Sequence, residues 1–172
     1  MAKTTARAAV RAVTRTVGRW TADGRLRPGF LIVGAQRCGT TSLFKTLSQH
    51  PAVLPAVFHK GVHYFDTGYH HGLAWYLGHF PTVRAAEAVR RQHGVPAVTG
   101  ESSPYYMFHP LAPQRIAADL PGVRLLVLLR DPVERAYSAH AHELARGYET
   151  EAFETALELE PARVAGERER LA

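Results

Sequence analysis

The sequence predicts an α/β fold of the P-loop type, in three layers, with a central parallel sheet flanked by helices. Two observations predict it. An apolar run at 30–33 leads through a glycine-bounded loop into an amphipathic helix that begins at Thr40. A second, nearly continuous apolar run at 123–129 ends at the start of another helix, and such a run is typical of the buried interior of a parallel sheet. Repeated strand-to-helix junctions of this kind indicate an α/β domain.

Length, composition and charge limit the class of protein that this chain can represent and the kind of ligand that it can bind. Its 172 residues suffice for one domain with a core, and 46% hydrophobic and 21% charged residues are ordinary for a soluble protein. The net charge of +6 suits a polyanionic ligand, although we expect no nucleic-acid polymer as partner. Because Cys38 is the single cysteine, no internal disulfide can form, and we expect a cytoplasmic location. No apolar run approaches the about 20 residues of a membrane span.

Two regions are expected along the chain, a basic N-terminal extension at 1–28 and a nucleotide-binding domain at 29–172. The extension has no acidic residue before Asp23, and its cations recur so that a helix would gather them in one stripe. One interpretation is weak contact with an anionic membrane, and the other is a solvated terminal segment. The cations of this basic stripe are Lys3, Arg7, Arg11, Arg15 and Arg19.

The remaining elements follow from local signals. Asp131 is a good N-cap, with Pro132 at the first helical position and Glu134 two residues later, which completes a capping box. Helices end before His50-Pro51 and at Gly94, since the residue before a proline disfavours helix and glycine closes helices. The expected strands lie at 30–34, 95–99 and 123–129, and the expected helices lie at 40–49, 83–93 and 113–120, after Asp131, and from 148 onward.

The loop between the first strand and its helix is the candidate binding site. Gly34 and Gly39 have P-loop spacing, and backbone N–H groups at a helix N-terminus make a site for phosphate or a similar oxyanion. Thr40 occupies the position of the P-loop lysine, and the loop's only cation is Arg37. Such a loop suits a 5′-phosphate with one further group better than a nucleoside triphosphate.

The segment at 34–43, Gly-Ala-Gln-Arg-Cys-Gly-Thr-Thr-Ser-Leu, resembles the 5′-phosphosulfate loop of sulfotransferases that use 3′-phosphoadenosine-5′-phosphosulfate (PAPS). It is most similar to the carbohydrate branch that includes the heparan sulfate enzymes. The resemblance covers residues 30–159, so the fold is expected to be incomplete at the C-terminus relative to the family. It implies transfer of a sulfuryl group from PAPS to a hydroxyl or amine of a carbohydrate or other small-molecule acceptor, without a metal. Two alternatives stay open, a non-catalytic nucleotide-binding fragment and a P-loop phosphotransferase.

The resemblance also implies roles for particular residues. The segment Arg130-Asp131-Pro132 onward resembles the 3′-phosphate site, in which Arg130 and Ser138 bind that phosphate. Arg37, where relatives carry lysine, is expected to stabilise charge on the bridging oxygen. The loop residues expected to hold the 5′-phosphosulfate are Arg37, Cys38, Gly39, Thr40, Thr41 and Ser42.

The expected proton acceptor is missing from its position in the family motif. The segment at 58–66 resembles Lys-Glu-x-His-aromatic-Phe, but Gly61 stands where the family has its general-base glutamate. His63 is the nearest titratable candidate, with a structural histidine as the alternative. His142, four residues after Ser138, is a second candidate near the reaction centre. By the same resemblance, Glu101 and Tyr105 are expected to line the acceptor side, and for Glu101 a role as alternative base or a purely structural role in the loop stays open. The histidines fit no zinc signature.

Overall fold

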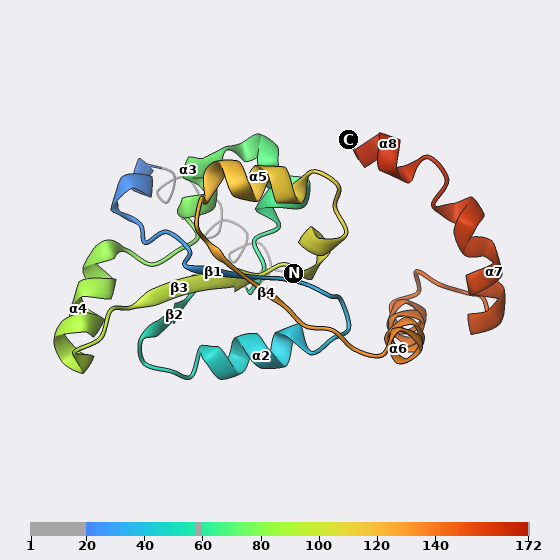
Figure 1. Cartoon of the computed structure of the whole chain (residues 1–172), viewed down its shortest axis with the longest axis horizontal. Coiled ribbons are helices and arrows are strands. Elements are labelled where there is room, and N and C mark those ends of the chain that lie inside the picture. The colour runs from blue at the N-terminus through green and yellow to red at the C-terminus, as the bar shows by residue number, and fades with distance from the viewer. Residues whose placement is uncertain (1–19, 58–59, 172) are drawn as a thin grey trace, which may run out of the picture.

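The computed structural model describes residues 20–57 and 60–171 and shows a four-stranded parallel sheet (Figure 1). The strand order is β2-β3-β1-β4, and Phe30 is in register with Gly100 on one side and with Arg124 on the other. The strands are β1 (Phe30–Gly34), β2 (Val53–Pro55), β3 (Val98–Ser102) and β4 (Arg124–Val127). The predicted central parallel sheet is confirmed.

Helices cover both faces of the sheet and make the predicted three layers. Figure 1 shows α2 on one face and α3 and α5 on the other, while α6, α7 and α8 lie to one side, beyond the end of β4. The helices are α2 (Thr40–Leu47), α3 (Leu73–Leu77), α4 (Val83–His93), α5 (Ala112–Asp119), α6 (Pro132–Ala145), α7 (Phe153–Arg163) and α8 (Glu167–Leu171). Single helical turns are η1 (Ala22–Gly24), η2 (Tyr64–Gly68), η3 (Tyr69–His71) and η4 (Pro104–Met107).

The alternation of side chains along β1 divides the core in two. Phe30 and Ile32 pack with Phe44 of α2 on one face, and Leu31 and Val33 belong to the larger cluster on the other. The larger cluster is rich in buried aromatic rings, which are contributed by Tyr64, Phe65, Tyr76, Phe80 and Tyr106. Both faces of β1 are therefore buried, and the strand fixes the point at which the following loop begins.

Helix starts follow the local sequence signals. The side chain of Asp131 accepts a hydrogen bond from the backbone N–H of Glu134 at 3.0 Å, as the predicted N-cap of α6 should. Thr82 caps α4 in the same way, and Gly94 closes that helix with a left-handed φ of 71°. These boundaries were predictable because a cap depends only on residues within one turn.

Two sequence expectations about strands are corrected. The strand expected at 95–99 lies three residues later, at Val98–Ser102, because Pro96 lacks the N–H that a ladder requires and Val95 is exposed. The short strand β2 was not predicted. The shift places Glu101 inside a strand instead of a loop, which changes what its side chain can reach.

The expectation that 123–129 forms a strand buried in the sheet interior is also wrong. Within the described residues, β1 is the only strand paired with β4, and Leu125 and Val127 are 52% and 49% exposed. Only Leu126 and Leu128, on the other side of the strand, pack against the core cluster under α2. The position at the sheet edge, rather than the sequence, decides this exposure.

The end of the expected N-terminal extension packs on the domain. Ala22 is part of the larger core cluster, Arg25 donates a hydrogen bond to the carbonyl of Phe80 at 2.9 Å, and the N–H of Leu26 donates to Pro81 at 2.8 Å. The basic stripe falls outside the described residues, so membrane contact and a cytoplasmic location stay predictions. Across residues 20–57 and 60–171, no helix has the length and apolar character needed to cross a membrane.

Candidate active site

The glycine-bounded loop opens a binding surface at the N-terminus of α2. Gly39 has a φ of 83°, which lets the chain turn sharply into the helix. Thr40, in the P-loop lysine position, is buried, whereas Thr41 and Ser42 are exposed. Unpaired N–H groups at this end of α2 can therefore meet an oxyanion, and the Thr40 side chain cannot replace the missing lysine.

The structure brings the two predicted anion sites together. The N–H of Ala35 donates to the carbonyl of Leu128 at 2.9 Å, which ties the loop to the chain just before Arg130. Across 101 positions of sequence, Nε of Arg37 donates to the hydroxyl of Ser138 at 3.2 Å. One ligand of nucleotide size can therefore reach the loop and the start of α6 at the same time.

Arg130 is held on α6 by an ion pair. Its Nη2 lies 2.9 Å from Oε2 of Glu134, and both side chains are largely exposed, at 41% and 66%. An exposed pair four residues apart contributes only about 0.3–0.5 kcal/mol. A phosphate, which offers a charge-assisted hydrogen bond of about 1.5–3 kcal/mol, can displace the carboxylate.

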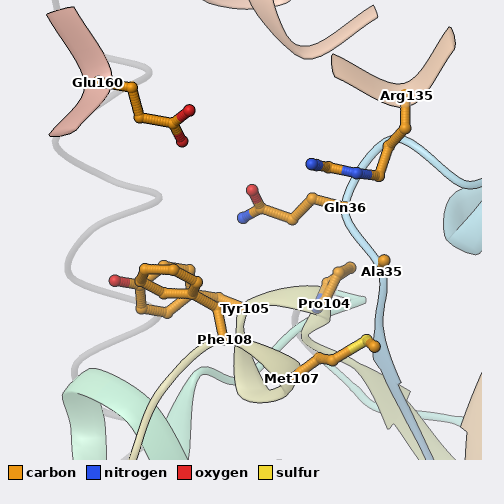
Figure 2. A pocket seen from close by; sticks show the side chains of 8 residues that line it. All are labelled: Ala35, Gln36, Pro104, Tyr105, Met107, Phe108, Arg135 and Glu160. Carbon is orange, nitrogen blue, oxygen red and sulfur yellow. The ribbon is translucent and has the colours of Figure 1, made fainter. Parts of the chain in front are cut away.

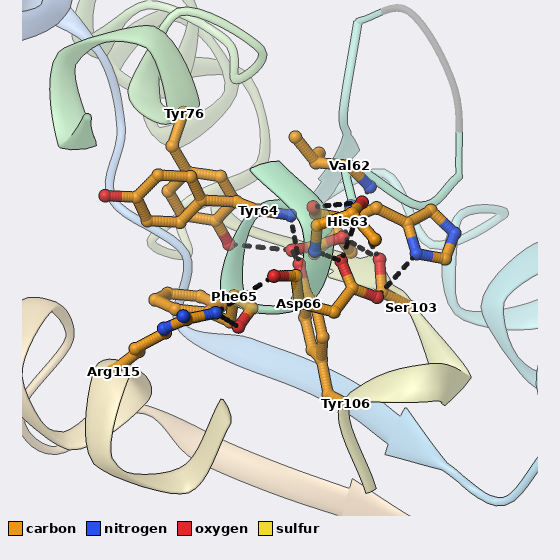
Figure 3. Close-up of polar contacts among 11 residues, drawn as sticks. Val62, His63, Tyr64, Phe65, Asp66, Tyr76, Ser103, Tyr106 and Arg115 are labelled. Carbon is orange, nitrogen blue, oxygen red and sulfur yellow. Dashed lines mark hydrogen bonds and ion pairs between the residues drawn. The ribbon is translucent and has the colours of Figure 1, made fainter. Parts of the chain in front are cut away.

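His63 forms a hydrogen-bonded pair with a buried carboxylate (Figure 3). Nδ1 of His63 lies 2.8 Å from Oδ2 of Asp66, and the side chains are 50% and 0% exposed. The hydrogen bond to Asp66 raises the pKa of His63. Burial acts to raise the pKa of Asp66, but the hydrogen bonds from His63 and from the N–H of Thr67 outweigh it, and the pKa of Asp66 is lowered. Asp66 is thus an anion that accepts from Nδ1–H, which leaves Nε2 as the basic nitrogen.

The backbone around this pair is fixed by three further contacts. His63 has a left-handed φ of 55°, and its N–H donates to the hydroxyl of Ser103 at 3.1 Å. Arg115 of α5 donates to the carbonyls of both Phe65 and Asp66 at 2.9 Å. An uncommon backbone conformation that is held so firmly is typical of functional positions.

The imidazole of His63 lies beside the position where the family glutamate would start. A Cβ placed on Gly61 would lie 3.5 Å from Nε2 of His63, and only 2.6 Å from the carbonyl oxygen of Ser102. The backbone of β3 therefore leaves no room for a side chain at position 61. The same space is reached instead by the basic nitrogen of His63.

Glu101 lies in the core rather than on a surface open to an acceptor, which fits the structural alternative for this residue. It is fully buried, and its carboxylate accepts hydrogen bonds from the Val62 N–H, the Ser103 hydroxyl, and the Tyr76 and Tyr106 hydroxyls at 2.7–3.0 Å. Burial raises its pKa, and the four hydrogen bonds oppose that rise. Because Glu101 lies on β3, its side chain points into the core. There it accepts from the N–H of Val62 and so joins the segment before His63 to the sheet.

Tyr105 lines a pocket next to the loop (Figure 2). The pocket has a volume of about 510 Å³, and Arg135 and Gln36 reach into it from α6 and the loop. The rings of Tyr105 and Phe108 lie 5.4 Å apart on its rim. The remaining lining residues are Ala35, Pro104, Met107 and Glu160.

Two further residues predicted from the sequence are His142 and Cys38, and two residues of the site were missed. His142 is half-buried on α6 and has no hydrogen bond or ion pair with the loop in the described part of the chain, and Sγ of Cys38 donates to the carbonyl of Gln36 at 3.6 Å. The missed residues are Asp66 and Lys60. The His-x-x-Asp spacing in a helical turn could have indicated Asp66, since it places the two side chains together. Lys60 stands at the lysine position of the family segment quoted above, and its Nζ donates to the Thr41 hydroxyl at 2.7 Å.

Known proteins are similar to this chain in sequence, and one solved structure is similar to it in fold. The chain is similar to the human Bifunctional heparan sulfate N-deacetylase/N-sulfotransferase 2, with 35% identity over 70% of this chain and 13% of that protein. It is 32% identical to the mouse Heparan sulfate glucosamine 3-O-sulfotransferase 3B1 over 78% of this chain and 31% of that protein. A solved sulfotransferase from Alicyclobacillus acidocaldarius matches with a TM-score of 0.60 and 33% identity, over 81% of this chain and 59% of that one.

These relatives extend well beyond the matched region, since the chain spans about an eighth to a third of their length. The match to the family itself is broader. The model of the Sulfotransferase domain family matches residues 27–163, which include the loop, the His63–Asp66 pair and the start of α6. The chain therefore belongs to the Sulfotransferase domain family.

Proposed function

We propose that this protein transfers a sulfuryl group from PAPS to a hydroxyl or amine of a carbohydrate acceptor. The observation that carries the proposal is the contact between Arg37 of the loop and Ser138 of α6. It unites a site for a 5′-phosphosulfate with a site for a 3′-phosphate, and PAPS carries both groups on one nucleoside. Family membership supports a sulfate donor, and the two-phosphate arrangement supports PAPS in particular.

The loop and Arg37 supply the electrostatic part of the mechanism. Backbone N–H groups at the start of α2 bind the 5′-phosphosulfate, and Arg37 approaches the bridging oxygen when its contact with Ser138 is exchanged for the ligand. As the sulfur–oxygen bond breaks, the electron pair stays on the 5′-phosphate. Arginine stabilises this charge but keeps its proton, because its pKa is too high for a general acid.

His63 supplies the base. Its Nε2 takes the proton of the acceptor hydroxyl or amine while the acceptor atom bonds to sulfur. Asp66 holds the ring in the tautomer with Nδ1 protonated and stabilises the imidazolium that forms. This His63–Asp66 pair takes the role that the family glutamate would have at position 61.

The pocket beside the loop suits a sugar. Tyr105 and Phe108 offer aromatic faces, and Gln36, Arg135 and Glu160 offer polar groups around them. Sugar rings combine apolar faces with hydroxyl edges, so both kinds of group are needed to bind one. Two of the relatives named above carry heparan sulfate in their names, which supports a carbohydrate acceptor for this chain as well.

A non-catalytic nucleotide-binding role is the second candidate, and Gly61 favours it because the usual base is missing. A phosphotransferase is less well supported, since buried Thr40 stands in the lysine position of the loop. Three ligands separate these roles. Binding of 3′-phosphoadenosine 5′-phosphate (PAP) far above AMP supports the proposed donor, and Mg²⁺-dependent ATP binding without a 3′-phosphate preference selects the phosphotransferase.

The proposal is tested by calorimetric titration with PAP and AMP, followed by transfer of labelled sulfuryl from PAPS to a desulfated heparan oligosaccharide. Arg130→Met and Ser138→Ala are expected to weaken PAP binding about 10- to 150-fold and about 10-fold, because charged and neutral hydrogen bonds are lost. AMP binding should stay unchanged. Arg91→Met, on the exposed face of α4, is the matched control. PAP binding without any transfer would select the non-catalytic role.

A further inference from the structure

The contact between His63 and Asp66 depends on one short turn of backbone. The element η2 is a single π-helical turn, in which the N–H of Gly68 donates to the carbonyl of His63, five residues earlier, at 2.8 Å. His63 precedes the turn with its left-handed φ of 55°, and Asp66 lies within it. The 2.8 Å contact between the two side chains therefore persists only while this turn keeps its shape.

Arg115 holds the carbonyl end of this turn from α5. A π-helix pairs each carbonyl with the N–H five residues later, so the carbonyls of Phe65 and Asp66 would need residues 70 and 71, which lie beyond the turn in η3. Nη1 of Arg115 donates to both of these carbonyls at 2.9 Å instead (Figure 3). The guanidinium lies 4.6 Å from the centre of the Tyr69 ring, which helps to fix its place.

A buried carboxylate holds the N–H end of the same segment. Glu101, on β3, accepts hydrogen bonds from the N–H of Val62 and from the hydroxyl of Ser103, both at 2.7 Å. That hydroxyl in turn accepts from the N–H of His63 at 3.1 Å. The anion thus serves the N–H groups and the cation serves the carbonyls, as the dipoles of the turn favour. The strand β3 and the helix α5 thereby hold opposite ends of the segment at 62–66.

The charges around His63 give this arrangement a measurable consequence. The hydrogen bond to Asp66 raises the pKa of His63, burial lowers it, and the charges of Glu101 and Lys60 raise and lower it respectively. Two further titratable groups beside the pair stay uncharged while His63 titrates, because burial raises the pKa of the phenol and lowers the pKa of the imidazole; they are Tyr106 and His109. The proton affinity of Nε2 therefore reports whether the Asp66 carboxylate is held against Nδ1.

We propose that Arg115 is a positioning residue, which acts through Asp66 on the base His63 by fixing the turn that carries both side chains. This inference rests on the proposed function and adds to it a residue that touches no substrate. A guanidinium by itself lowers the pKa of a nearby imidazole, because like charges repel. Arg115 has the opposite effect, since it keeps the carboxylate on Nδ1 and thereby keeps Nε2 basic.

The pKa of His63 is measured by NMR from its Cε1–H resonance, assigned with His63→Gln, in the wild type, Arg115→Met and Arg115→Lys. The pKa is expected to fall in Arg115→Met, in the same direction as in Asp66→Asn and by less, with Arg115→Lys between Arg115→Met and the wild type. Sulfuryl transfer on the high-pH plateau should fall about 3- to 10-fold in Arg115→Met, because the base is misplaced. The control is Arg27→Met, which removes another arginine hydrogen bond to a backbone carbonyl of α5, that of Asp119 at 3.3 Å, and should keep the wild-type pKa and rate.

A double variant shows whether Arg115 acts through the carboxylate. In Asp66→Asn, the added change Arg115→Met should not lower the pKa of His63 further, because the group that Arg115 positions is already lost. An equal fall in both backgrounds would overturn the proposal. So would an unchanged pKa in Arg115→Met, which shows a merely structural role, or a raised pKa, which shows that only the charge acts.

Two further outcomes are distinguishable from these. If Arg115→Met does not fold, Arg115→Lys decides, since a pKa of His63 below the wild-type value supports the proposal and an unchanged one overturns it. A wild type and variants that show the expected pKa changes, but no transfer of sulfuryl from PAPS, would refute the proposed function and leave the effect of Arg115 on His63 standing.

Discussion

Replacing Asp66 by Asn is expected to lower the pKa of His63 and to weaken it as a base. The 2.8 Å contact joins an imidazole that is 50% exposed to a carboxylate that is 0% exposed. A charge-assisted hydrogen bond contributes about 1.5–3 kcal/mol, and solvent around the imidazole reduces this toward the lower end. The transfer rate on the high-pH plateau should therefore fall about 10-fold in the variant, because about 1.4 kcal/mol corresponds to a factor of ten.

The pH dependence gives the sign of the effect. His63 acts as a base only when neutral, so the rate rises with pH through its pKa, which lies above 6.5 in the wild type. In Asp66→Asn this rising limb of the pH–rate profile should move to lower pH. A structural role for Asp66 would lower the rate at every pH without moving the limb. An unmoved limb would therefore refute the assignment of His63 and Asp66 as the base pair.

The free energy of unfolding should also depend on pH, because the pKa values of His63 and Asp66 differ between the folded and unfolded states. The raised pKa of His63 stabilises the fold below about pH 6.5 and ceases to do so as pH rises through the folded value. The lowered pKa of Asp66 stabilises it above about pH 3.8 and ceases to do so as pH falls through its folded value. In urea unfolding, the difference in stability between the wild type and Asp66→Asn should be largest between about pH 3.8 and pH 6.5. Asp23→Asn, which removes an exposed charge in η1, should show no such window.

Three further substitutions test the geometry. Gly61→Glu should lower the thermal midpoint without raising the transfer rate, because its Cβ would meet the Ser102 carbonyl at 2.6 Å; a faster and equally stable variant would contradict this. Glu101→Ala should cost about 3–5 kcal/mol in denaturant unfolding, since it leaves four buried donors unpaired, and a cost below 1 kcal/mol would refute the buried network. Glu134→Gln should tighten PAP binding about two-fold by calorimetry, because it releases Arg130 from an exposed ion pair; weaker binding would show that Glu134 positions Arg130 for phosphate.

Parts of the site were predictable because they depend on neighbours in the sequence. The glycine-bounded turn into α2 and the Asp131 cap of α6 each lie within about one helical turn, so composition and spacing suffice to place them. The missing glutamate at position 61 and the candidate His63 were also visible in the sequence alone. The roles assigned to Arg37, Arg130 and Ser138 stay predictions that the ligand experiments test.

The sequence by itself determined the strand-loop-helix units and the kind of anion they can bind, because backbone geometry at a cap or a glycine turn is local. The tertiary structure alone decided which side chains share the site. It pairs Lys60 with Thr41 and Arg37 with Ser138. It also buries Glu101 among four hydrogen-bond donors and places β4 at an exposed edge of the sheet. These contacts join segments up to 101 positions apart, and no local pattern encodes the register that brings parallel strands and their loops together.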